Sequence, residues 1–268
     1  MLLCPAIWFT LEEGPGMKRF LIHGVRVVCA ALITLVITFF PFWKWESALY
    51  DLRVRLSPKE KPDPAIVLIG IDDKTLDAFE GKWPLPSNAY IALLERLKSA
   101  TPFSTAFLFP LHRESEWTER DLQGLAQVTS GSQNLFHAVK LIPTGADYPE
   151  KRLPNITPML SFTLIDSQHF AKDRVSRRGA LWFHSDRFTE YSLANLYFGK
   201  DLAQDRTFMK KTKDVDGGQT FLTRYAGTKG TFPILSFIDV LNGKIDESWL
   251  KNKIILIGPT YGNESQGF

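Results

Sequence analysis

The stretch AIVLIGIDDKTLDAFEGKWPLPSNAYIALLERLKSA, residues 65–100, decides the fold. Residues 65–71 form an unbroken apolar run of strand length between Pro64 and Asp72, a pattern typical of a buried strand. Apolar side chains then recur at helical spacing from residue 88 onward, with Ser87 or Asn88 as the expected N-cap. A buried strand followed by an amphipathic helix predicts an α/β domain.

The same alternation continues along the chain. Residues 104–110 and 135–142 are predicted strands, and the helix between them is expected to begin at a capping Thr118. Residues 143–158 are rich in proline, glycine and charge, which predicts a long surface excursion. Strands that alternate with helices favour parallel pairing, so we expect a single mixed, largely parallel sheet with flanking helices.

One segment near the N-terminus predicts a transmembrane helix at residues 25–43. Residues 27–43 carry no charge and are about long enough to cross a bilayer, and bulky residues at the end disfavour a signal-peptide cleavage site. Because Lys18 and Arg19 precede it, residues 1–24 are expected in the cytoplasm and residues 44–268 outside. This predicts a single-pass protein of the bacterial inner membrane with a periplasmic or extracellular domain.

The N-terminus and the region after the span carry two further predictions. The segment that starts at Met17 resembles the beginning of a membrane protein more than residues 1–16 do, so translation is hypothesised to start there. Residues 45–56 place leucines at helical spacing between charged residues and predict a short amphipathic helix.

Composition excludes several classes of function. The formal net charge is +3 and the basic residues are scattered, so we expect no nucleic-acid partner. The five histidines lie far apart in the sequence, so no metal site is expected, and the phosphate-binding, dinucleotide-binding and nucleophile-elbow motifs are missing. We therefore expect no cofactor and no catalytic residue.

Two neighbouring acids remain as candidates. Asp72 and Asp73 follow the first strand, where α/β proteins place ligands, so they are suited to holding a cation or to acid–base chemistry. The alternative is that one of them caps the short helix at residues 74–79. Trp83, in a turn bracketed by prolines, either walls a pocket or packs into the core. Arg178 belongs to a basic cluster that either binds an anionic ligand or forms a solvated turn.

Together these segments resemble the CHASE type 2 domain, a cyclase- and histidine-kinase-associated extracellular sensory domain of bacterial signalling proteins. The resemblance rests on segments that occur in the family's order: LYDLRVRL, IVLIGIDDKTL, GKWPLP, DRVSRRGAL, RYAGTKGTFPILSFIDVLNGK and LKNKIILIGPTYG. It implies an α/β domain outside the membrane that acts as signal input, followed by more membrane helices and an output domain. No such helices or output follow Gly262, which indicates either a truncated frame or an anchored sensor that stands alone.

Three positions depart from the family pattern. Ser87 stands where the turn usually has arginine, Leu108 where the next strand carries aspartate, and Arg174 where an Asp-x-Asp-Gly turn has glycine. The candidate positions for sensing a ligand are Asp72, Asp73, Trp83, Asp173 and Arg178.

The leading hypothesis is a non-catalytic, membrane-anchored sensor of an unknown small molecule that acts through a homodimer or a membrane partner protein. Two alternatives stay open. One is an anchored hydrolase or transferase that uses Asp72 and Asp73 with a divalent cation. The other is a degenerate scaffold remnant of a sensor.

Overall fold

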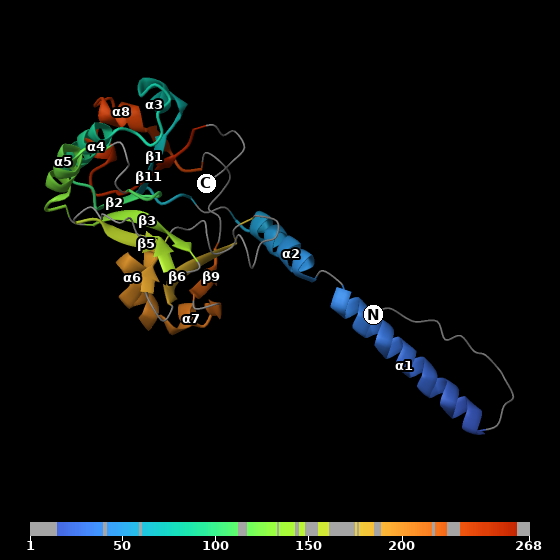
Figure 1. Ribbon diagram of the computed structural model, residues 1–268. Coiled ribbons are helices and arrows are strands. Elements are labelled where there is room, and N and C mark those ends of the chain that lie inside the picture. Colours follow the sequence, from blue (N-terminus) through green and yellow to red (C-terminus); the bar gives the residue numbers. More distant parts are fainter. Residues whose placement is uncertain are drawn as a thin grey trace. The chain divides into compact units, whose positions relative to one another are not determined.

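The computed structural model describes residues 15–39, 42–58, 61–111, 117–132, 134–142, 145–147, 155–160, 175, 177–184, 189–215, 218–223 and 231–261. The chain divides into two compact units, Met1–Pro58 and Lys59–Phe268, and each is described by itself (Figure 1).

The first unit contains two helices, α1 (Pro15–Phe39) and α2 (Phe42–Leu56). Helix α2 confirms the short helix expected at residues 45–56 and begins three residues earlier. The predicted span at residues 25–43 is not continuous in the described residues, because α1 ends at Phe39 and α2 begins at Phe42. Among the helices described here, none is both long enough and apolar enough to cross a membrane. The membrane span therefore stays a prediction.

The second unit is built on a seven-stranded sheet, and its order is β10-β1-β11-β2-β3-β4 with β5 also paired to β3. The strands are β1 (Ile66–Ile71), β2 (Ser104–Phe107), β3 (Leu135–Ile142), β4 (Gly145–Asp147), β5 (Thr157–Leu160), β10 (Ile234–Ser236) and β11 (Ile254–Pro259). Every pairing in this sheet is parallel except that of β3 with β4. The predicted largely parallel sheet is confirmed. Strands β4 and β5 extend into the segment expected to be a surface excursion.

The last strand lies in the middle of this sheet. Ile254 of β11 is in register with Ile66 of β1 on one side and with Ser104 of β2 on the other. Gly70 of β1 is closely surrounded by side chains of its neighbours: a Cβ atom there would lie 2.6 Å from Thr260 Oγ1 and 2.9 Å from Ile234 Cγ2. Glycine is required at this position by packing, because any side chain would displace one of its neighbours.

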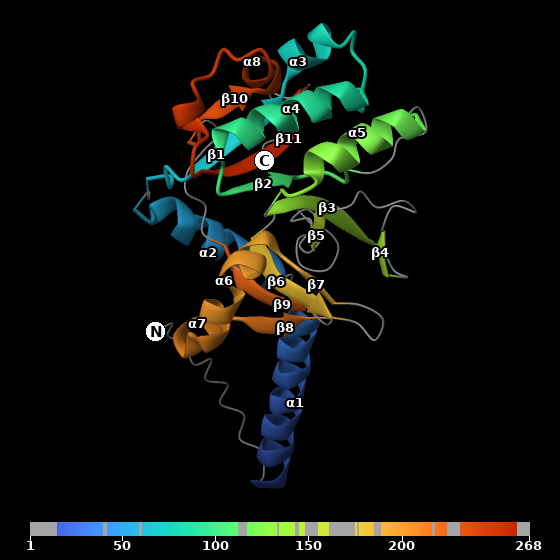
Figure 2. The ribbon, with the colours of Figure 1, turned by 90° about the vertical axis from the view of Figure 1, so that its left-hand side faces the viewer.

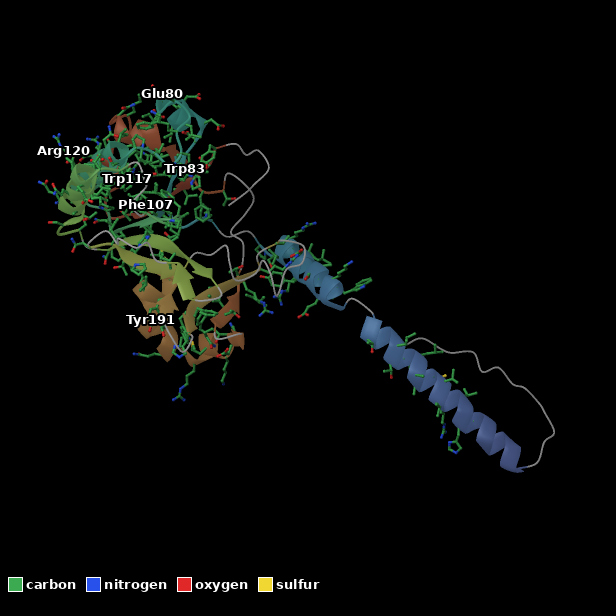
Figure 3. All side chains as sticks on the ribbon, in the orientation of Figure 1. Glu80, Trp83, Phe107, Trp117, Arg120 and Tyr191 are labelled. Carbon is green, nitrogen blue, oxygen red and sulfur yellow. The ribbon has the colours of Figure 1, made fainter. Side chains whose placement is uncertain are left out.

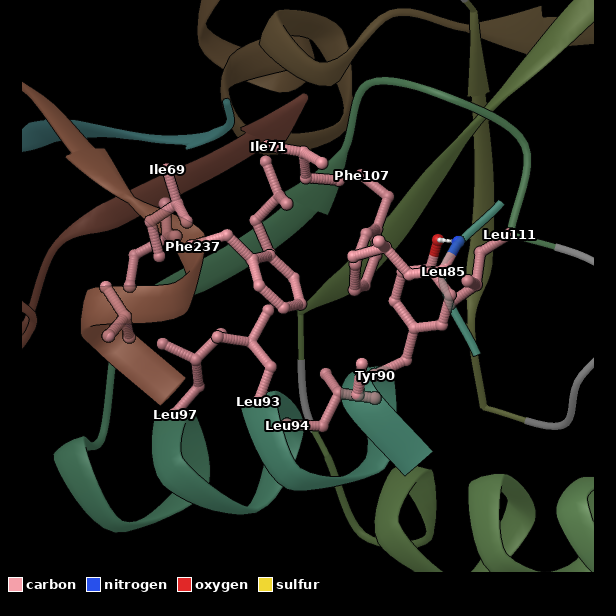
Figure 4. Packing of buried hydrophobic residues seen from close by; sticks show 14 of the residues in the cluster. Ile69, Ile71, Leu85, Tyr90, Leu93, Leu94, Leu97, Phe107, Leu111 and Phe237 are labelled. Carbon is pink, nitrogen blue, oxygen red and sulfur yellow. Dashed lines mark hydrogen bonds between the residues drawn. The ribbon is translucent and has the colours of Figure 1, made fainter. Parts of the chain in front are cut away.

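Helices cover one face of the sheet and enclose the larger core (Figures 1 and 2). They are α4 (Ser87–Ala100), α5 (Glu119–Thr129) and α8 (Phe237–Leu241), with the short α3 (Asp73–Ala78) beside them. Figure 4 shows Ile69 and Ile71 of β1 packed against Leu93 and Leu97 of α4, with the Phe237 ring between them. These side chains are almost fully buried, and the alternation of β1 with the helical spacing of α4 places them all on one interface.

The opposite face of the sheet is covered by α6 (Leu193–Gln204), which packs on a smaller cluster. That cluster includes Ala106, Phe136, Ala138, Met159 and Leu193. Successive residues of β2 point to opposite faces, so Ala106 joins this cluster while Phe107 joins the larger core. The main sheet is therefore the middle of three layers.

A second sheet was not predicted. Strands β6 (Arg178–His184), β7 (Thr189–Tyr191), β8 (Lys213–Val215) and β9 (Gly218–Leu222) form an antiparallel sheet in the order β7-β6-β9-β8. The expectation of a single sheet is wrong because the β6–β7 and β8–β9 connections are too short for a parallel crossover. The short helix α7 (Arg206–Met209) precedes β8.

Two predicted helix starts have different outcomes. Thr118 caps α5 as expected, in a capping box with Asp121. The predicted cap of α4 is wrong, because Pro86 is the N-cap and Ser87 is already the first helical residue. The Ser87 hydroxyl is used elsewhere, as described below.

Candidate functional site

Asp72 lies directly after β1 and caps α3. Its Oδ1 atom accepts hydrogen bonds from the Thr75 backbone N–H at 2.9 Å, the Thr75 hydroxyl at 2.6 Å and the Ser236 hydroxyl at 3.0 Å. Thr75 is fully buried, and its Oγ1 atom also accepts from the Ile238 N–H at 3.3 Å. This network, named here the Asp72 network, joins the start of α3 to the junction of β10 and α8. The capping interpretation of Asp72 is confirmed.

Asp73 has a different environment from its neighbour. It is exposed and is the first residue of α3, where a carboxylate interacts favourably with the helix dipole. In the part of the chain that the structure describes, no three His, Cys, Asp or Glu side chains gather into a possible metal site. The described residues therefore add no third ligand of these types to Asp72 and Asp73.

A pocket of about 350 Å³ lies beyond the carboxyl ends of the strands, and it is named here the aromatic pocket. It is lined by Trp83, Pro84, Tyr90, Phe109, Pro110, Leu111 and Trp117. All seven side chains are aromatic or aliphatic, and none carries a formal charge at neutral pH. Figure 3 shows Trp83 and Trp117 on the same part of the second unit as Phe107.

The aromatic rings that line the pocket contact one another at an angle. The ring centroids of Trp83 and Phe109 are 5.3 Å apart with an interplanar angle of 68°. Tyr90 lies 5.8 Å from Trp117 at 56° and 6.2 Å from Phe109 at 49°. Edge and tilted contacts of this kind are the arrangements that the ring quadrupole favours. The pocket therefore has stiff walls formed by rings that support one another.

Three segments distant in sequence bring the walls together. Phe109 follows β2, Trp83 lies in the turn between α3 and α4, and Tyr261 follows β11 and packs on Trp83 with centroids 5.5 Å apart. Because β2 and β11 are parallel neighbours, their carboxyl ends lie at the same edge of the sheet. Ligands of open α/β sheets bind at this edge.

The floor of the pocket is fixed from below. Tyr90 is 1 % exposed, and its hydroxyl accepts a hydrogen bond from the Leu85 N–H at 3.2 Å (Figure 4). Trp117 is 6 % exposed, whereas Trp83 is 37 % exposed. Trp83 is thus the wall that faces solvent, and Tyr90 and Trp117 belong to the packed interior.

A polar cluster joins the two helices beside the pocket. Asp121 Oδ1 accepts from the Ser87 hydroxyl at 2.6 Å, and its Oδ2 accepts from the Thr118 N–H at 2.7 Å and the Thr118 hydroxyl at 2.6 Å. The Ser87 hydrogen bond, followed by those of Thr118, holds the pKa of the Asp121 carboxyl below its ordinary value. Ser87 therefore connects α4 to α5.

A second charged cluster lies on α8. Asp239 accepts from Lys74 at 2.6 Å and lies 3.3 Å from Lys244, and the Lys74 hydrogen bond is the main reason that the pKa of the Asp239 carboxyl is lowered. On the other face of the sheet, burial raises the pKa of the Tyr197 phenol to about 12, and the neighbouring Ser104 hydroxyl opposes that shift. Neither group lines the aromatic pocket.

The described residues among the five predicted to sense a ligand do not form one site. Trp83 lines the aromatic pocket, and Asp72 is engaged in its network. Arg178 is the first residue of β6 and so belongs to the antiparallel sheet. Asp173 lies outside the described residues. Leu108 follows β2 and packs on the smaller cluster, on the face away from the larger core.

Sequence reasoning missed most of the pocket. Tyr90 was recognised only as part of a helical face, and Phe109, Leu111 and Trp117 were not singled out. A usable signal was present: aromatic and proline residues directly after the second strand, and a tryptophan directly before the capping Thr118.

The fold and the pocket define an α/β domain with an apolar ligand-sized cavity at the carboxyl edge of a parallel sheet. The family model of the CHASE2 domain matches residues 28–267, so the chain belongs to the CHASE2 domain family. This family comprises extracellular sensory domains. No curated protein and no solved structure shows significant similarity to the chain.

Proposed function

We propose that this chain is a membrane-anchored, extracytoplasmic signal-input domain that binds a small molecule and has no catalytic activity of its own. The observation that carries the proposal is the CHASE2 match, because it covers residues 28–267 and these include the entire main sheet and the aromatic pocket. The fold agrees with a sensory role, since the pocket lies where α/β sheets bind ligands.

Trp83 is the sensing residue that this proposal retains with a structural argument. It is a pocket wall and is exposed enough to meet an arriving ligand. Asp72 supports the site indirectly, because it fixes the end of β1 and the start of α3, the helix that precedes Trp83. Asp73, Asp173 and Arg178 remain proposed contributors without a described contact to the pocket.

Signal transmission requires that the ligand bind two arrangements of the domain with different affinities. In this proposal the difference passes through α2 and the predicted membrane segment to a second copy or to a membrane partner protein. The bacterial inner membrane is the proposed location, with residues 44–268 on the outer side.

Topology is the first test. The chain has two cysteines, Cys4 and Cys29, so replacing both with serine and adding Lys251→Cys gives a single exposed thiol in the second unit. In bacterial cells whose outer membrane is permeabilised and whose inner membrane is intact, a membrane-impermeant maleimide should label this thiol. A matched variant with cysteine at position 18 should react only after the cells are lysed.

Fusions at Phe268 give an independent readout. Alkaline phosphatase should be active there and a fluorescent protein should be dark, because the first folds only outside the cytoplasm and the second only inside it in this assay. An inactive phosphatase, a bright fluorescent fusion and a Lys251→Cys thiol that is labelled only in lysate would overturn the proposed location.

A further inference from the structure

The aromatic pocket is specific enough in its chemistry to define the kind of molecule it accepts. We propose that it binds a small, uncharged, planar aromatic molecule of one or two rings. The inference rests on the proposed sensory function, and it adds the position of the site and the class of ligand.

Among the residues that the structure describes, the lining disfavours ligands that depend on charge. None of the seven lining residues has a carboxylate, ammonium or guanidinium group. A charged molecule that enters an apolar cavity loses hydration and gains no countercharge, so its binding is disfavoured. Asp121, on the helix that follows Trp117, directs both carboxylate oxygens at Ser87 and Thr118. An uncharged ligand avoids this cost.

The wall chemistry favours an aromatic ligand over an aliphatic one. Four of the lining residues are aromatic, and their rings already meet at angles of 49° to 68°. A further ring can continue this pattern of edge and tilted contacts, which stabilise aromatic pairs beyond the area they bury. The two prolines and Leu111 offer flat or rounded apolar surfaces that complete the enclosure.

The size of the cavity limits the ligand to one or two rings. Its volume of about 350 Å³ is near the lower end of the ligand-pocket range. Trp83, at 37 % exposure, forms the side open to solvent, so a ligand reaches the pocket past this ring. Tyr90 and Trp117 are buried and form the fixed back of the site.

The test uses the full chain in detergent or nanodiscs and indole as the probe, followed by isothermal titration calorimetry. We expect saturable binding of indole. Indole-3-acetate, which adds a carboxylate, should bind at least tenfold more weakly. Tetramethylammonium, which would exploit the same rings through cation–π attraction, should show no saturable binding.

Matched tryptophan variants locate the binding. Trp83→Ala should weaken indole binding about tenfold, the equivalent of 1.4 kcal/mol. Trp249→Ala removes a tryptophan that is 53 % exposed and does not line the pocket, so it should leave binding unchanged. Leu111→Phe narrows the cavity without removing a ring and should weaken indole binding. Circular dichroism shows whether each variant is folded. If either Leu111→Phe or Trp83→Ala is unfolded, the other still tests the site.

Three outcomes would overturn the inference: no saturable binding of indole, tighter binding of tetramethylammonium or indole-3-acetate than of indole, or equal loss with Trp83→Ala and Trp249→Ala. The topology experiment is independent of all three. Indole binding with the domain in the cytoplasm would reject the proposed function and keep the site. The expected topology without indole binding would keep the proposed location and reject the proposed ligand class.

Discussion

The Asp72 network and the aromatic pocket lie at the same edge of the sheet and differ in almost every property. The first is polar and turned inward, and the three hydrogen bonds described for Asp72 Oδ1 join segments of the fold. The second is apolar and opens past Trp83. A pair of acids after a buried strand is therefore not by itself a functional site, because the free backbone N–H groups at a helix start also need hydrogen-bond partners. The two regions meet at Phe237. This residue follows Ser236 of the Asp72 network, and its ring centroid lies 6.4 Å from that of Tyr90 in the pocket.

Removing Phe237 should damage both regions and give the largest effect. The side chain is fully buried in the larger core, so Phe237→Ala should lower the free energy of unfolding by about 3–5 kcal/mol through lost burial and a cavity. Chemical denaturation measures this. Phe103→Ala, at a ring that is 51 % exposed, is the control and should cost far less. Equal losses would show that the core is not centred on Phe237.

Breaking the Asp72 network should affect stability more than replacing the neighbouring acid. Asp72→Ala removes a cap and the acceptor for Thr75 and Ser236, which should cost about 2–3 kcal/mol of unfolding free energy. Asp72→Asn should retain much of it, since asparagine is an equally good cap. Asp73→Ala should cost less than about 1 kcal/mol. A larger effect for Asp73 would reverse the assignment of roles.

Gly70→Ala tests how tightly the strand ends are packed next to this network. The added methyl group meets Thr260 and Ile234, and we expect a loss of about 1–3 kcal/mol from overpacking. Thr260 is a suitable second site because its buried hydroxyl has no hydrogen-bond partner among the described residues. The double variant with Thr260→Ala should recover part of the loss, as a double-mutant cycle would show. Strict additivity would mean that the two residues do not interact.

The smallest effect concerns the polar support beside the pocket and depends on pH. The pKa of Asp121 is depressed in the folded protein, so its contribution is present above the unfolded-state pKa and is lost as the pH falls through the folded-state pKa. Wild type should therefore lose more stability than Asp121→Asn between about pH 5 and pH 3. Carboxyl NMR should show the Asp121 pKa moving upward in Ser87→Ala. An unchanged Asp121 pKa in Ser87→Ala would show that Ser87 does not stabilise the Asp121 carboxylate.

Local features of the sequence predicted much of the fold. The strand at residues 66–71, the helix from residue 87 and the Thr118 cap depend on neighbouring residues, so spacing and capping chemistry reveal them. The cap of α4 was misplaced because Ser87 has a partner 34 residues away in the sequence, and no local pattern encodes that bond. The antiparallel sheet was not predicted because its strands were interpreted as a continuation of the alternating strands and helices of the main sheet. Its hairpins pair β6 with β7 and β8 with β9.

The pocket was harder to predict than the fold. Its walls come from the turn before α4, the segment after β2 and the residue before the α5 cap, and only the parallel pairing of β2 with β11 brings Phe109 and Tyr261 to Trp83. Trp83 was a candidate from the sequence, where its proline-bracketed turn left a pocket wall and core packing as alternatives. The other rings look like ordinary core residues until their neighbours are known.

The central position of β11 has a consequence for how the chain reaches its fold. Strands β1 and β2 each pair with β11, so each has an unpaired edge until the residues that separate it from β11 have been synthesised. Unpaired strand edges attract other strands, and contacts between distant segments form slowly. The chain is therefore most vulnerable to aggregation just before residues 254–259 arrive. We expect molecular chaperones to have their largest effect on folding yield during that interval.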